Sequence, residues 1–245
     1  MTEPEARARV DQIERLIERR YREKVFGHPF VQELSAGRLP RKKLVGFVAN
    51  WFSYAWEVNT AIAASYHKNL WFLKRHMDVH DLVTDKIGDE LVNPGPGGHI
   101  KLVIKLGEAL GLSYQALAEQ RLLPEARANL DMAVRLLNEG PYAESIAFLM
   151  KEKQFGTLAQ KFFQALTTHY GLSADQAEYF DVHHAADLEE HEGVMAHGQS
   201  SAYTLEMILR DGYQPERPGW DLDYAAELGV DAMALLLDGV YRRYE

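Results

Sequence analysis

The sequence predicts an all-α protein that folds as one domain, and three observations support this prediction. Apolar residues recur every three or four positions in nearly every long segment, as they do on the buried face of a helix. No segment shows the sustained alternation of apolar and polar residues that is typical of a half-buried strand. No repeat, low-complexity tract or linker divides the chain, so residues 1–245 are expected to form a single helical bundle.

Glycine and proline mark the ends of the expected helices. A first helix is expected over about residues 5–24, before Gly27-His28-Pro29-Phe30, and a long helix over about residues 40–67, with a proline suited to its first turn. The next helix covers about residues 71–91 and ends at the Gly/Pro-rich loop 93–98. Further helical segments are expected over about residues 99–110, 113–120, 124–138, 142–170, 173–197 and 224–244. The prediction is a bundle of about seven helices.

The composition excludes several classes of function. The net charge is −9 and no basic stripe is present, which argues against nucleic acid as a partner. The absence of cysteine excludes disulfides, thiolate metal sites and cysteine nucleophiles. No run approaches 18 apolar residues, and the charged N-terminal segment lacks the apolar core of a signal peptide. We therefore expect a cytoplasmic protein with no membrane partner.

Two carboxylates fall on apolar helix faces. An unpaired buried carboxylate is costly, so such a residue should be paired, protonated or bound to a metal. Glu152 lies at helical spacing from Phe148, Phe155 and Ala159, and it is either a metal ligand or half of a buried ion pair with another helix. Glu90 continues an apolar face just before the Gly/Pro-rich loop, where an exposed position is the alternative.

Four histidines add imidazole groups to this set. His99 opens a helix in line with an apolar face, where a satisfied core histidine is the alternative to a ligand. His184 and His191 are two helical turns apart and so point the same way, with Asp187 one turn from each. A second register, offset by about 100°, contains His183, Asp187 and Glu190, and the sequence does not choose between the two.

The candidate metal ligands are therefore three carboxylates and three histidines, namely Glu90, His99, Glu152, His184, Asp187 and His191. Mixed carboxylate and imidazole ligands from facing helices are how helical bundles build di-iron and di-manganese sites. The set is consistent with one or two Fe2+ ions that keep open positions for O2.

The order of these residues resembles the haem-oxygenase-like superfamily, which includes pyrroloquinoline quinone synthase, the thiaminase-like TenA proteins and the haem-oxygenase-like di-iron oxidases. The resemblance covers about residues 27–198. It is carried by Gly27-His-Pro-Phe30, Leu44-Val-Gly-Phe-Val-Ala-Asn50, Leu106-Gly-Glu-Ala-Leu-Gly-Leu112 and the histidine-rich segment. It implies a haem-oxygenase-like helical bundle.

Departures from each branch of the superfamily favour the di-iron oxidases. The quinone synthases carry an arginine where this chain has Trp51, and a catalytic histidine where it has Ala159. TenA thiaminases typically use a cysteine, which is absent here. The di-iron oxidases retain ligands that match Glu90, His99, Glu152, His184 and His191. Their aspartate matches Leu188, one residue after Asp187, so the resemblance leaves open whether one, two or no metal ions bind.

The resemblance implies an iron-dependent oxidoreductase that activates O2 and oxidises a small organic substrate by decarboxylation, desaturation, C–C cleavage or N-oxygenation. A homodimer is expected, as is common in such bundles. One alternative is a cofactorless oxidase of the quinone-synthase type. Another is a non-catalytic binding bundle in which Glu152 and the histidines form an internal polar network. A haem protein with His28 or His99 as the iron ligand is a further alternative.

Overall fold

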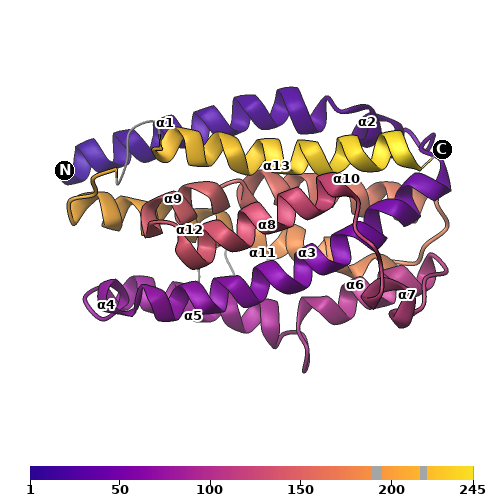
Figure 1. The fold of residues 1–245 in the computed structure, drawn as a ribbon, viewed down its shortest axis with the longest axis horizontal. Coiled ribbons are helices and arrows are strands. Elements are labelled where there is room, and N and C mark those ends of the chain that lie inside the picture. The colour runs from indigo at the N-terminus through magenta and orange to yellow at the C-terminus, as the bar shows by residue number, and fades with distance from the viewer. Residues whose placement is uncertain (189–194, 216–219, 245) are drawn as a thin grey trace.

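The computed structural model describes residues 1–188, 195–215 and 220–244, and these residues are mostly α-helical, which confirms the predicted all-α class. Figure 1 shows an elongated bundle whose long helices run roughly along one axis. Helices α1 and α13 lie along one side of the bundle, whereas α3, α5 and α6 lie along the opposite side. The N- and C-termini lie at opposite ends.

The expected number of about seven helices is wrong. The described residues form thirteen α-helical segments, of which α4 is a single turn. In chain order they are α1 (Glu3–Tyr21), the π-helical turn η1 (Arg22–Phe26), α2 (Pro29–Ser35), α3 (Arg41–Lys68), α4 (Leu70–Leu73), α5 (Met77–Leu91), α6 (His99–Ala109), α7 (Tyr114–Ala118), α8 (Pro124–Glu139), α9 (Tyr142–Leu149), α10 (Glu152–His169), the 3-10 turn η2 (Asp175–Ala177), α11 (Glu178–Leu188), α12 (His197–Arg210) and α13 (Leu222–Arg243).

Two of the additional helices arise where the chain breaks without glycine or proline. The segment expected as one helix over 142–170 is divided into α9 and α10 at Met150 and Lys151. The segment expected over 71–91 begins with α4 and continues as α5. Helix α12 was not expected at all: the sequence placed the end of a helix at His197, where the structure begins one. The spacing of apolar residues indicates which face of a helix is buried, and it does not reveal where one helix ends and the next begins on the same face.

The break at Lys151 frees the carbonyl oxygen of Phe148 from the helical ladder. The Lys151 ammonium donates a hydrogen bond to this oxygen at 3.1 Å. On the other side, Gly229 of α13 packs so closely that a Cβ there would lie 2.5 Å from the same oxygen. The break therefore turns the Lys151 side chain into the bundle, where it is 6% exposed.

A row of buried aromatic rings fixes the helices that carry the candidate site. Phe162 of α10 packs against Phe47 of α3, with ring centroids 5.1 Å apart, and against Phe180 of α11, at 4.7 Å. All three rings are almost completely buried. Trp51 lies one helical turn after Phe47, and His183 lies one turn after Phe180. The aromatic row thus sets the position of both residues along the bundle.

None of the described helices combines the length and the apolar content that a membrane-spanning helix requires.

Gly98 brings the start of α6 against the end of α5. Its φ of +59° lies in the region that favours glycine, and a Cβ at this position would overlap the backbone carbonyl of Glu90. This close approach places His99, the next residue, beside the Glu90 side chain.

We predict that Gly98→Ala lowers the free energy of unfolding by at least about 2 kcal/mol, because it combines an unfavourable φ with a backbone clash. Chemical denaturation measures the change. Gly88→Ala is the matched control on α5, since a Cβ there meets no atom within 4 Å. The control should be neutral or raise stability by about 0.5–1 kcal/mol, the usual gain for alanine over glycine inside a helix. Equal stability of the two variants would contradict the described loop geometry.

Candidate metal centre

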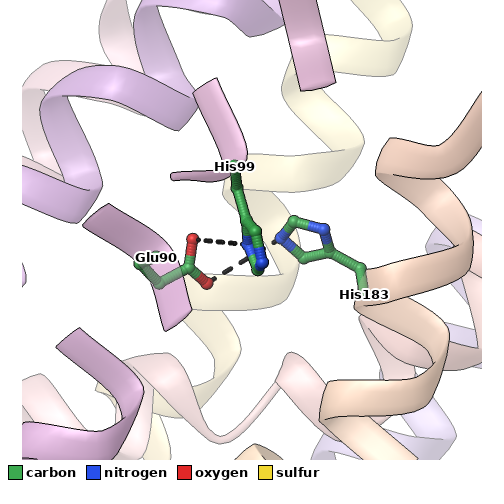
Figure 2. A group of neighbouring side chains, drawn as sticks. All are labelled: Glu90, His99 and His183. Atoms are coloured by element: carbon green, nitrogen blue, oxygen red, sulfur yellow. Dashed lines mark hydrogen bonds and ion pairs between the residues drawn. The ribbon is translucent and has the colours of Figure 1, made fainter. Parts of the chain in front are cut away.

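Three buried side chains from three helices meet at the centre of the bundle. Glu90 comes from the last turn of α5, His99 from the first residue of α6 and His183 from α11 (Figure 2). One ligand atom from each of the three lies within 4.8 Å of the others. His99 Nδ1 is 3.1 Å from Glu90 Oε2, and His183 Nε2 is 3.8 Å from Glu90 Oε1.

The hydrogen bonds of His183 define which ring nitrogen carries its proton. Nδ1 lies 2.8 Å from the backbone carbonyl of Tyr179, which can only accept, so Nδ1 is the donor. Burial, together with the charge of His99, lowers the pKa of His183 to about 4. The imidazole is therefore neutral near pH 7, and the lone pair of Nε2 faces the Glu90 carboxylate.

Glu90 remains ionised although it is buried. Burial alone would raise its pKa, but the charge and hydrogen bond of His99 outweigh burial and hold the pKa well below its usual range. Asn59 of α3 donates a hydrogen bond to Oε2 at 2.5 Å and orients the carboxylate. Within the described part of the chain the ion-pair partners of Glu90 are these two histidines, with no lysine or arginine.

The donor set suits a divalent transition metal. Metal binding needs a deprotonated carboxylate and a neutral imidazole, which are the states of Glu90 and His183 near pH 7. Two histidines and one carboxylate with open positions form the ligand pattern of non-haem Fe(II) oxygenases. The Tyr179 carbonyl and the Asn59 amide supply the outer contacts that usually orient such ligands.

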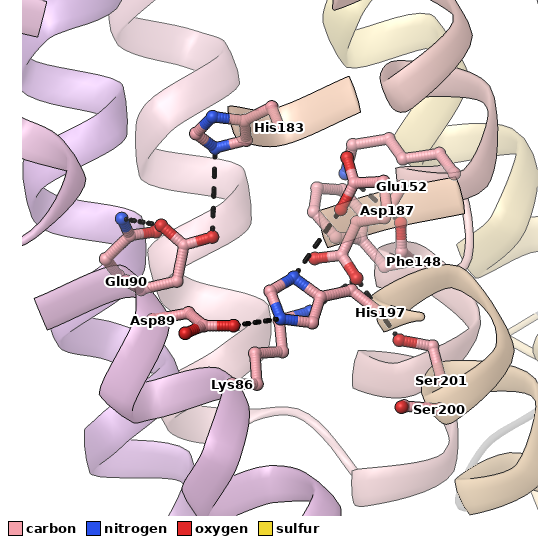
Figure 3. Close-up of polar contacts among 12 residues, drawn as sticks. Lys86, Asp89, Glu90, Phe148, Glu152, His183, Asp187, His197, Ser200 and Ser201 are labelled. Atoms are coloured by element: carbon pink, nitrogen blue, oxygen red, sulfur yellow. Dashed lines mark hydrogen bonds and ion pairs between the residues drawn. The ribbon is translucent and has the colours of Figure 1, made fainter. Parts of the chain in front are cut away.

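Glu152 lies in a second polar cluster next to the first (Figure 3). Its carboxylate forms an ion pair with Lys86 of α5, and Ser201 Oγ donates to Glu152 Oε2 at 3.2 Å. The Lys86 side chain is 8% exposed and that of Glu152 is 17% exposed. The sequence left two roles open for Glu152, a metal ligand or half of a buried ion pair with another helix. In this structure Glu152 forms the ion pair, with Lys86 of α5.

Asp187 faces a histidine of the same second cluster. Its Oδ1 lies 3.5 Å from His197 Nδ1, and Asp89 Oδ2 lies 3.3 Å from His197 Nε2 (Figure 3). Burial lowers the pKa of His197, but the two carboxylates outweigh burial and raise it to about 10. His197 is therefore a cation near neutral pH that offsets the charge of Asp187.

The structure brings together only part of the predicted ligand set. It joins Glu90 and His99 with His183, the histidine of the second register, whereas His184 points toward Gln160, with its Nε2 3.2 Å from Gln160 Nε2. His191 lies outside the described residues. His183 points into the bundle, where its ring packs against the rings of His99 and Phe155, with centroids 4.6 and 5.5 Å apart.

His28, the other histidine considered as a haem ligand, does not join the cluster. Its Nδ1 accepts a hydrogen bond from the Phe30 amide at 3.1 Å, and its Nε2 lies 3.3 Å from Asp238. Both ring nitrogens of His28 therefore already have polar partners within the protein.

Sequence reasoning missed Lys86 and His197. A signal for Lys86 was present, since it lies seven residues after Val79 and four before Glu90, and so on the apolar face of α5. His197 had no comparable signal, because it begins a helix that the sequence did not indicate.

Comparison with known proteins supports the fold and the family. The model of the TENA/THI-4/PQQC family matches residues 10–213. Pyrroloquinoline-quinone synthase from Pseudomonas aeruginosa is 30% identical over 157 residues, which cover 62% of this chain and 60% of the relative. The same enzyme from Cronobacter sakazakii is 27% identical over 158 residues, again covering 62% and 60%. The matches thus span less than two thirds of these curated relatives.

Solved structures share the arrangement of helices at low sequence identity. A TenA homologue from Pseudomonas syringae superimposes with a TM-score of 0.73 at 15% identity, covering 94% of this chain and 91% of that one. A domain with a heme oxygenase-like fold from Shewanella denitrificans gives a TM-score of 0.70 at 12% identity, covering 96% and 92%. These matches confirm the predicted haem-oxygenase-like fold.

We predict that Glu152→Leu alone lowers the free energy of unfolding by about 3–5 kcal/mol, because it leaves the Lys86 ammonium buried without its counter-ion. The double variant Lys86→Met/Glu152→Leu should recover most of this loss, since an apolar pair of similar volume is often neutral or stabilising. Chemical denaturation of the wild type, both single variants and the double variant measures the coupling. A stable Glu152→Leu single variant would contradict the buried ion pair.

Proposed function

The chain belongs to the TENA/THI-4/PQQC family, and on that premise we propose that it is an iron-dependent oxidoreductase that activates O2 to oxidise a small organic substrate. Its relatives named pyrroloquinoline-quinone synthase support an oxidase or a related activity. The proposal places a ferrous ion at Glu90, His99 and His183.

One observation carries this proposal. The neutral Nε2 of His183 and the ionised carboxylate of Glu90 are both acceptors, and they face each other across 3.8 Å inside the protein. Two acceptors without a shared proton repel each other, whereas a cation held between them would be bound by both. Fe2+ bound there would supply electrons and open coordination positions for O2.

The protein's own residues supply charge, orientation and a dry environment. Glu90 provides the negative charge, and Asn59 holds its carboxylate in place. The Tyr179 carbonyl keeps the proton of His183 on Nδ1, so that Nε2 is free to bind. Trp51 donates to Tyr179 Oη at 2.7 Å, and both side chains are nearly fully buried, which limits the access of water.

We propose one metal ion per chain rather than two. Lys86 neutralises Glu152, and His197 offsets Asp187, so both of these carboxylates already have a cationic partner from the protein. Glu90 has no such partner among the described residues beyond the two imidazoles. The expected substrate, O2 and homodimer remain predictions of this proposal.

The second candidate is a cofactorless oxidase of the quinone-synthase type, which the 30% identity to pyrroloquinoline-quinone synthase favours. Two positions argue against it. Trp51 stands where that branch has an arginine, and its indole N–H donates a hydrogen bond to the Tyr179 hydroxyl. Ala159 stands where that branch has its catalytic histidine, and it is completely buried.

We predict that anaerobic Fe(II) titration of the purified chain gives about one iron per chain and that His183→Ala weakens binding at least about tenfold. His184→Ala is the matched control, since this neighbouring histidine points toward Gln160 instead, and it should bind iron like the wild type. Metal analysis and calorimetry measure both quantities. Oxygen consumption by the iron-loaded wild type, absent in His183→Ala, tests the activity.

Each other outcome of this titration has a definite meaning. No iron binding to the wild type would refute the metal proposal and favour the cofactorless oxidase. Two irons per chain would refute the single-ion proposal. Loss of binding in His184→Ala but not in His183→Ala would show that the other histidine register holds the metal.

A further inference from the structure

A buried lysine side chain enters the pocket beside the proposed metal residues, and the proposed function does not use it. Lys151 stands at the break between α9 and α10, and its side chain lines the pocket together with Glu90 and His183. The pocket contains about 560 Å³ of empty space, part of it open to solvent. A small molecule that enters the pocket would therefore meet the amino group of Lys151.

The contacts of Lys151 fit an uncharged amine. Its Nζ donates a hydrogen bond to the Phe148 carbonyl oxygen at 3.1 Å and lies 3.6 Å from the centroid of the Phe148 ring. Both contacts take up an N–H, the second through the face of the ring. Neither contact uses the single lone pair of a neutral amine. The Glu152 carboxylate, next in sequence, is held instead by Lys86 and Ser201.

Burial favours the uncharged form of this amine. It lowers the pKa of Lys151 to about 7, with the Glu152 carboxylate opposing the effect and the Lys86 ammonium adding to it. About half of the Lys151 side chains are then neutral near pH 7, whereas an ordinary lysine is neutral in only ~1 molecule in 2,500. A lysine freed of water and charge in this way becomes a nucleophile toward carbonyl carbon.

We propose that Lys151 is a nucleophilic amine that forms an imine with an uncharged aldehyde or ketone held in this pocket. The Nζ lone pair bonds to the carbonyl carbon, and the carbon–oxygen bond then breaks. The oxygen leaves as water, which carries away the two hydrogens of the amine. This condensation needs neither an oxidant nor a reductant, and it does not depend on iron, so it goes beyond the proposed function.

The charges around the pocket favour an uncharged ligand. Three carboxylates line it, namely those of Glu90, Glu152 and Asp187. An anionic carbonyl compound would be repelled by the ionised Glu90 and would gain no ion pair from an uncharged Lys151. The stacked rings of Trp51 and Phe155, with centroids 5.4 Å apart, add an apolar wall.

The test treats the metal-free protein with benzaldehyde and sodium cyanoborohydride at pH 7, which reduces an imine to a stable secondary amine. Peptide mass spectrometry then maps the labelled lysines. Lys151 should be labelled at least about tenfold more than Lys153, the matched control, which is half exposed and pairs with Glu14. This preference should fall as the pH rises toward about 10, where ordinary lysines also lose their protons. It should vanish when the protein is unfolded in guanidinium chloride.

A second comparison tests the class of ligand. 4-Nitrobenzaldehyde and 4-formylbenzoate have nearly the same shape, but only the second is an anion. The ratio of Lys151 to Lys153 labelling corrects for the different reactivity of the two aldehydes. We expect this ratio to be at least about fivefold higher for the neutral aldehyde.

Several results would overturn the proposal. They are labelling of Lys151 no greater than that of Lys153, preferential labelling of Lys86, or a preference that neither pH nor unfolding changes. Equal ratios for the two aldehydes would refute the uncharged class of ligand. Lys151→Met should lose the preferred adduct while the other lysines are labelled as before, and the wild-type map decides the question if this variant fails to fold. Because no iron is present, a negative result here leaves the Fe(II) titration unaffected, and the reverse is also true.

Discussion

Glu90 holds a negative charge where water scarcely reaches it, and the surrounding helices are arranged around that charge. Helix α5 delivers the carboxylate, the turn at Gly98 returns the chain so that His99 lies beside it, and α11 brings His183 from the other side. Asn59 of α3 adds a hydrogen bond. Among the described residues the ion-pair partners of Glu90 are these two histidines, so a bound cation, as proposed above, would add charge compensation beyond theirs.

Three carboxylates on apolar helix faces, which look alike in sequence, are distinguished by their partners. Glu152 has the Lys86 ammonium, and Asp187 has the charged His197. Glu90 faces two imidazoles, one of them neutral. The charge that the protein itself supplies thus separates carboxylates that complete an internal ion pair from the one that is suited to a metal. Charge pairing between helices depends on tertiary packing, so sequence spacing alone could not assign these roles.

The fold was predictable to the extent that apolar periodicity and Gly/Pro breaks define helices. Helices α3, α8 and α13 begin and end within about two residues of expectation. The division at Met150 and Lys151 contains no glycine or proline, and the start of α12 was not expected although Gly193 precedes it. Glu90 and His99 were predictable because both flank a Gly/Pro-rich loop on apolar faces. The choice of His183 over His184 was not, since each follows a buried aromatic residue, Tyr179 or Phe180, by four positions, and the contact of His183 with His99 arises only from packing against α6.

The unpredicted break also brings a residue from another pair of helices to the pocket beside the proposed metal residues. The proposed metal residues come from α5, α6 and α11, whereas Lys151 enters the same pocket from the junction of α9 and α10. Gly229 of α13 and the Phe148 carbonyl shape that junction without touching Glu90 or the two histidines. The junction and the proposed metal residues are therefore built from different helices of the bundle. Because different helices supply the two parts of the pocket, one part can change while the fold is kept, and a shared fold at 12–15% identity does not identify a substrate.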